Sequence, residues 1–76
     1  MMSPRQIVLA DSVVTLTARQ IDVARCAADG FDVAGTAAVL CIGVETVKHH
    51  RAQLLSKLGA LTITAACVRL VRCGLI

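Results

Sequence analysis

Five side chains that can carry positive charge gather in one short stretch, which is VETVKHHRAQLLSKLG. They are Lys48, His49, His50, Arg51 and, two helical turns later, Lys57. Basic side chains on one element bind anions, including the phosphates and base edges of nucleic acid. A second interpretation stays open, in which the stretch is only the solvated face of a helix.

The distribution of charge favours an anionic partner. The net charge of the chain is +3. Residues 1–42 hold three arginines and four aspartates, a net charge of −1, whereas residues 43–76 hold five Lys or Arg and one glutamate, a net charge of +4. All excess positive charge therefore lies in the half that contains the basic stretch.

The cysteines and histidines do not have the spacing of a metal site. Four cysteines stand singly among apolar residues, and adjacent histidines are not the usual ligand pair. We therefore predict buried, reduced thiols, with a disulfide or a redox or metal role as less favoured alternatives. No catalytic pattern stands out either, so we predict neither enzymatic activity nor a cofactor. The four cysteines are Cys26, Cys41, Cys67 and Cys73.

Length and composition indicate one small domain. The chain has 76 residues, of which 57% are hydrophobic and 1% aromatic. So much apolar surface in a small domain suggests that a partner subunit covers part of it. No run approaches the roughly 18 apolar residues of a membrane span, and the start lacks the apolar stretch of a secretory signal. We expect a cytoplasmic protein that does not bind membranes.

Capping residues place the first two helices. Thr17 and Gln20 have the spacing of a capping box, which predicts a helix over residues 18–29. Asp32 can cap a short helix over residues 33–40, and a glycine-containing turn follows it. Two helices joined by such a turn form a helix-turn-helix. The first helix is expected to face the core with Val23, Ala24, Ala27 and Ala28.

The third helix, over about residues 44–58, carries the basic stretch. At 100° per residue, Val47, Leu54 and Leu58 fall within about 20° of one direction and predict a buried seam. His50 flanks that seam, where a packed, hydrogen-bonded histidine is favoured over a ligand. The opposite face holds Glu45, Lys48, His49, Ala52 and Ser56.

The fourth helix, over about residues 63–73, has an apolar band wider than one packing face needs. We therefore predict that it forms a dimer interface. The residues assigned to that interface are Ile63, Ala66, Cys67, Leu70 and Val71. Residues 1–15 precede the helices as an N-terminal arm whose conformation stays open. Five apolar arm residues are expected to pack on the body: Ile7, Val8, Leu9, Val13 and Val14.

Two stretches, LTARQIDVARCAADG and AAVLCIGVETVKHHRAQLLSKLGA, resemble the LuxR/GerE-type helix-turn-helix family of bacterial transcription regulators. That family typically begins L-T-x-R-E and later runs T-V-K-x-H-x-x-x-(apolar)-x-x-K-L-G. The resemblance covers about residues 16–75 without a gap. Departures from the pattern are Gln20 for glutamate, Gly35 for glutamate, Thr36 for an apolar residue and Gly43 for serine or threonine.

The resemblance implies an all-α, four-helix domain over residues 16–76. Its third helix would enter the DNA major groove and its fourth would form a homodimer. Lys48, His49 and Ala52 would then face the bases. The residues implied to contact the DNA backbone are Thr46, Arg51 and Lys57, with Arg19 as an addition.

Two functions follow as hypotheses. The first is a homodimeric, sequence-specific regulator of transcription that binds double-stranded DNA. The second is a protein-interaction module that heterodimerises with another LuxR-type regulator or contacts RNA polymerase. Salt-dependent DNA binding separates them, because phosphate contacts release counterions and protein contacts of this kind do not.

Overall fold

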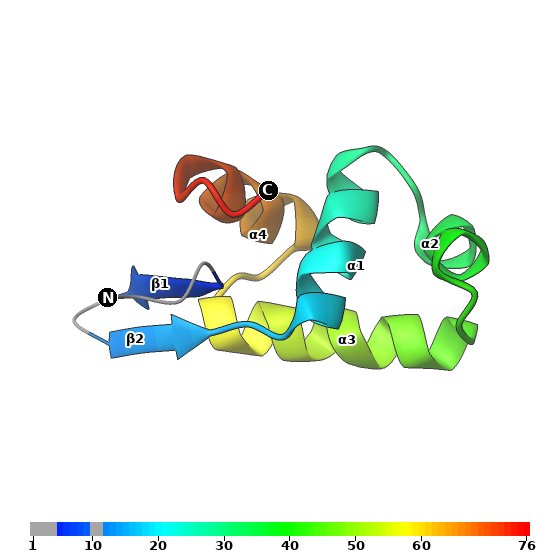
Figure 1. Cartoon of the computed structure of the whole chain (residues 1–76), viewed down its shortest axis with the longest axis horizontal. Coiled ribbons are helices and arrows are strands. Elements are labelled where there is room, and N and C mark those ends of the chain that lie inside the picture. Colours follow the sequence, from blue (N-terminus) through cyan, green and yellow to red (C-terminus); the bar gives the residue numbers. More distant parts are fainter. Residues whose placement is uncertain (1–4, 10–11) are drawn as a thin grey trace.

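The computed structural model describes residues 5–9 and 12–76 as a β-hairpin followed by four helices (Figure 1). The all-α, four-helix architecture with an N-terminal arm is confirmed, and the described residues of the arm form the hairpin. Helices α1 and α4 each end one residue earlier than predicted. The elements are β1 (Gln6–Leu9), β2 (Ser12–Thr15), α1 (Ala18–Ala28), α2 (Val33–Leu40), α3 (Val44–Leu58) and α4 (Ile63–Arg72).

Side chains cap three of the four helices at their first turn. Thr17 Oγ1 accepts from the Gln20 amide N–H at 3.1 Å, and Gln20 Oε1 accepts from the Thr17 amide N–H at 3.0 Å. These two bonds form the predicted capping box. The side chains of Asp32 and Thr62 each accept one amide N–H in the first turn of α2 and α4, without a reciprocal bond. Helix α3 begins after Gly43, which has no side chain to cap it.

The hairpin packs on the helices with one face only. Ile7 is 3% exposed and belongs to the core, and Leu9 and Val14 pack against it. Val8 and Val13 pair across the hairpin but are 54% and 58% exposed. The prediction that all five residues pack on the body is therefore wrong for Val8 and Val13, because successive residues of a strand point to opposite faces.

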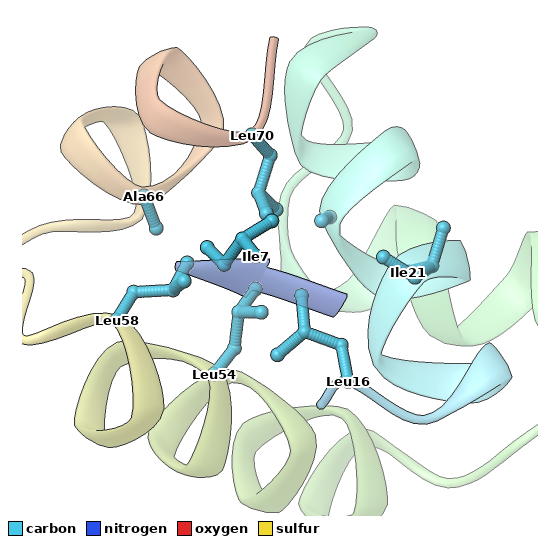
Figure 2. Packing of buried hydrophobic residues seen from close by; sticks show 8 residues of the cluster. Ile7, Leu16, Ile21, Leu54, Leu58, Ala66 and Leu70 are labelled. Atoms are coloured by element: carbon cyan, nitrogen blue, oxygen red, sulfur yellow. The ribbon is translucent and has the colours of Figure 1, made fainter. Parts of the chain in front are cut away.

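One core cluster joins the hairpin to three of the helices (Figure 2). Leu54 and Leu58 of α3 point toward Ala66 and Leu70 of α4, with Ile7 of β1 between them. A second cluster joins α1, α2 and α3 through Val23, Ala37 and Val47. Figure 1 shows α3 running beneath the other three helices, with α2 at its N-terminal end and the hairpin at its C-terminal end. Packing from both clusters fixes how α3 lies relative to the rest of the chain.

The cysteines divide into a buried and an exposed pair. Cys26 and Cys67 are buried free thiols, as predicted, whereas Cys41 and Cys73 are exposed, which corrects the prediction for these two. Both exposed cysteines are C-cap residues, one of α2 and one of α4. Cys67 Sγ donates to the Ala24 carbonyl at 3.5 Å. Burial raises the pKa of the Cys67 thiol above its ordinary value, and the nearby Arg51 cation opposes that rise.

Candidate DNA-binding surface

The outward face of α3 carries the side chains that the sequence assigned to base contacts. Lys48, His49 and Ala52 are all exposed. On the opposite side of the helix, Val47 and Leu54 are fully buried, and so is Leu58, as the seam predicts. Lys48 Nζ lies 3.3 Å from Glu45 Oε1, and both side chains are more than half exposed. Such a surface ion pair contributes little stability, so Lys48 is free to exchange this carboxylate for an anion of a partner.

The N-terminus of α3 is the open end of this surface. Thr46 is exposed in the first turn, and no side chain caps the helix. The first amide N–H groups of a helix point outward and carry partial positive charge. A phosphate group is a suitable acceptor for them.

Arg51, which the resemblance implies contacts the DNA backbone, is half-buried and makes a hydrogen bond within the chain. Its Nη2 donates to the Phe31 carbonyl at 3.2 Å, and its Nε is buried. This bond ties α3 to the turn between α1 and α2. A Cβ atom on Gly35 would lie 3.1 Å from the Phe31 ring, so the glycine leaves room for that ring beside α2. Phe31 therefore contacts both sides: its carbonyl accepts from Arg51 and its ring packs beside Gly35.

His50 lies between the seam and the outward face. It is half-buried, which agrees with a packed histidine. Its Nδ1 is buried and makes no hydrogen bond to the part of the chain that the structure describes. The expected hydrogen bond is therefore wrong for this nitrogen, because packing positions the ring without placing an acceptor beside it.

Lys57 lies at the other end of the outward face and joins three elements. Its Nζ donates to the Thr15 carbonyl at 3.0 Å and to Gln20 Oε1 at 3.1 Å. An ammonium group has three donors, so one remains for an anion outside the chain. Arg19, in the same turn of α1 as Gln20, is exposed and lies 3.6 Å from Asp22. This second surface ion pair also leaves its cation accessible.

Gln53 belongs to this surface, and the sequence analysis did not assign it a role. Its Oε1 accepts from Gln20 Nε2 at 3.1 Å. Together with His49, Ala52, Ser56 and Lys57 it lines a shallow recess of about 370 Å³. Helical periodicity could have found it, because four residues advance the helix by only about 40° from His49.

Helix α4 presents a different surface. Ala66 and Leu70 are fully buried in the chain's own core, and Cys67 is nearly so. These three residues of the predicted interface therefore have little side-chain surface left for a partner. Val68 and Val71 are 46% and 56% exposed. An apolar groove of about 400 Å³ runs between α1 and α4 and is lined by Ala27, Ala28, Ile63, Thr64, Cys67, Val68, Val71 and Arg72.

The groove corrects one further expectation of the sequence analysis. Ala28 is exposed at the groove rather than turned toward the core as expected. Arg69, which belongs to the basic half of the chain, donates through Nη1 to the Leu58 carbonyl at the end of α3. Arg51 and Arg69 thus make internal contacts, and the positive charge on the outward face of α3 comes from Lys48 and Lys57.

Two other kinds of site can be addressed directly. Within residues 5–9 and 12–76, no three His, Cys, Asp or Glu side chains come close enough to hold a metal ion. No single helix among these residues is long and apolar enough to cross a membrane. Helices α3 and α4 reach that length and composition only when taken together, and they are bent by 59° at the break between them.

Helices α2 and α3, joined by a short turn and braced by α1, form a helix-turn-helix with the polar face of its second helix exposed, which is the arrangement of a DNA-binding domain. Residues 14–70 match the family described as "Bacterial regulatory proteins, luxR family". The match covers most of the chain, which therefore belongs to the luxR family of DNA-binding transcription regulators. A search of curated proteins found no match.

Proposed function

We propose that the chain is a homodimeric, sequence-specific regulator of transcription whose helix α3 enters the major groove of double-stranded DNA. The observation that carries the proposal is the geometry of α3. Its apolar side is fixed by two core clusters, while Lys48, His49 and Ala52 project from the other side. A rigid helix with a polar outer face fits the major groove, which is wide enough to admit it. Such a regulator would act in the cytoplasm, where bacterial DNA lies.

The exposed residues of α3 suit separate parts of the DNA. Lys48 suits the O6 and N7 acceptors of guanine, His49 suits a neighbouring base edge, and the methyl group of Ala52 suits a thymine methyl. Thr46 with the open N-terminus of α3, the remaining donor of Lys57, and Arg19 suit phosphates. We assign Arg51 to positioning α3 through its bond to the Phe31 carbonyl, and the guanidinium keeps further donors for a phosphate.

The exposed surface of α4 supports the homodimer. Val68 and Val71 lie beside the apolar groove, and a second copy of α4 would cover them. The proposed interface therefore consists of Ile63, Val68 and Val71, with Ala66, Cys67 and Leu70 supporting it from the core. A two-fold dimer binds two half-sites about one helical turn apart, so its site is a pseudo-palindrome.

In vitro selection from random duplex DNA tests the proposal, because it reports binding and the preferred site together. We expect an enriched pseudo-palindrome and a dissociation constant that rises steeply with salt in fluorescence anisotropy. An enriched sequence without symmetry would refute the homodimer while leaving DNA binding intact.

A second function is favoured by the apolar groove itself. The chain could pair through α4 with a full-length LuxR-type regulator, or contact RNA polymerase, and modulate transcription without binding DNA. No salt-dependent DNA binding below about 10 μM, near the tight end of ordinary non-specific affinity, would favour this second function.

A further inference from the structure

The side-chain amides of Gln20 and Gln53 are linked in a way that fixes both of them. Gln20 is 1% exposed and its Nε2 donates to Gln53 Oε1 at 3.1 Å. Gln53 lies on the exposed side of α3, next to Ala52. The link therefore connects a buried group of α1 to the surface that would face DNA.

The orientation of the Gln20 amide follows from its two other partners. The backbone N–H of Thr17 lies 3.0 Å from Gln20 Oε1, and Lys57 Nζ lies 3.1 Å from the same atom. Both groups can only donate. A nitrogen in that place would face two donors, so the oxygen must stand there and the NH₂ group must point to Gln53.

This orientation determines what Gln53 presents outside the chain. Its oxygen is used by Gln20, so its NH₂ group lies on the other branch of the planar amide, away from α1. Gln53 lines the recess shared with His49 and Ser56, where a partner could meet this branch. Gln53 can therefore donate hydrogen bonds to a partner, while its acceptor is already occupied.

We propose that Gln53 contacts DNA as a fixed hydrogen-bond donor, with Gln20 as its positioning residue. The inference rests on the proposed function, in which α3 lies in the major groove. The partner atom is a hydrogen-bond acceptor of the duplex, either a phosphate oxygen or an acceptor on a base edge such as a purine N7. Fixing the amide in advance removes part of the entropy cost of binding.

Gln20→Glu is the sharpest test, because it reverses the amide of Gln53 without removing the side chain. A carboxylate still accepts from Thr17 and Lys57, so the cap of α1 and the bond to α3 remain. Its second oxygen needs a donor, so Gln53 would turn its NH₂ group inward and its oxygen outward. The outward oxygen of Gln53 would then repel the same DNA acceptor.

Binding to the selected duplex is measured by fluorescence anisotropy for Gln20→Glu and for Gln53→Met, which removes the donor without changing charge. We expect each variant to bind about tenfold more weakly, the worth of one good hydrogen bond. Arg25→Gln is the matched control, because it is exposed in the last turn of the same helix and lowers the net charge by one, as Gln20→Glu does. The DNA affinity of the control should fall only by a small factor, and this factor should shrink at higher salt.

Repeating the selection with Gln53→Met identifies the partner atom. Weaker binding to all sequences alike assigns the bond to a phosphate, whereas lost preference at one base pair per half-site assigns it to a base edge. If the wild type binds the duplex and both variants bind it as tightly as Arg25→Gln does, the inference is overturned.

Side-chain NMR of the free protein tests the orientation even if the chain does not bind DNA. In the wild type, the NH₂ group of Gln20 should exchange slowly with water and that of Gln53 quickly. In Gln20→Glu, the NH₂ group of Gln53 should become protected. Unchanged fast exchange in this variant would overturn the positioning role of Gln20. Failure of wild-type binding, with the exchange as expected, would instead count against the proposed function.

Discussion

Helices α3 and α4 pack against the same core but leave different surfaces. Leu54 and Leu58 of α3 and Leu70 of α4 point into one cluster (Figure 2). The outward face of α3 is polar and carries Lys48, whereas that of α4 exposes Val71 beside an apolar groove. The apolar seams are alike in kind, so the partner that each helix suits is determined by the side chains on its outer face.

The two surfaces also differ in how firmly their side chains are held. At the C-terminal end of α3, hydrogen bonds from Lys57 and Gln20 link the helix to α1 and β2. Partners that bind through directed hydrogen bonds gain from such fixed groups. The exposed valines of α4 need no fixed polar partner, because burial of apolar surface is not directional.

Leu54→Ala should have the largest effect, because it damages the core that supports both surfaces. Leu54 is fully buried, so we expect a loss of about 2–5 kcal/mol in the free energy of unfolding. Urea denaturation followed by circular dichroism measures it. Leu61→Ala is the control, since Leu61 is 96% exposed and its truncation should change stability little. Equal losses in the two variants would contradict the shared core.

Val71→Asp should disrupt the dimer surface of α4 without changing the polar surface of α3. A charge at this exposed position opposes apolar association without entering the core, so we expect a monomer in sedimentation equilibrium. Binding to the paired half-sites should weaken about a hundredfold, because the second half-site no longer benefits from linkage. Leu70→Asp would not make this separation, because Leu70 is fully buried and its substitution would unfold the chain.

Val8→Asp provides a matched control for that variant. Val8 is similarly exposed, but it lies on the outer face of the hairpin. It should leave the dimer and its DNA affinity unchanged. A dimer that survives Val71→Asp would place the interface on a surface other than that of α4.

The helices were predictable because their signals are local. The caps at Thr17, Asp32 and Thr62 depend on residues three positions apart, and the seam of α3 depends on helical periodicity. The hairpin was not predicted. The sequence carries no strong signal for the pairing of Ile7 with Val14, and only the alternating burial shows which face packs.

The sequence predicted which side chains of the candidate site face outward, but not the hydrogen bonds that they make. Periodicity places Lys48 and His49 outward, and the structure agrees. It does not show that Arg51 binds the Phe31 carbonyl or that Arg69 binds the Leu58 carbonyl, because these partners are distant in sequence or lie on the backbone. It also missed Gln53, whose significance depends on Gln20, a residue of another helix.

Lys48→Ala should affect the polar surface alone. We expect a loss of about 1–3 kcal/mol in binding to the selected duplex and a relaxed preference at one base pair per half-site. The dimer and the stability should not change, because the side chain is exposed and its surface ion pair with Glu45 lies within the same helix. Repeating the selection with this variant measures the preference. An unchanged preference would show that Lys48 does not contact a base.

Lys57→Met should have the smallest effect and should distinguish phosphate contact from base contact on the same helix. Methionine keeps the apolar stem but loses the bonds to Thr15 and Gln20, which costs about 1 kcal/mol of stability. DNA binding should weaken evenly over all sequences, and the slope of affinity against salt should fall by about one. Anisotropy titrations at several salt concentrations measure that slope. Because Lys57 shares Gln20 with Gln53, a change in base preference instead would mean that Lys57 acts through Gln53 and not through a phosphate.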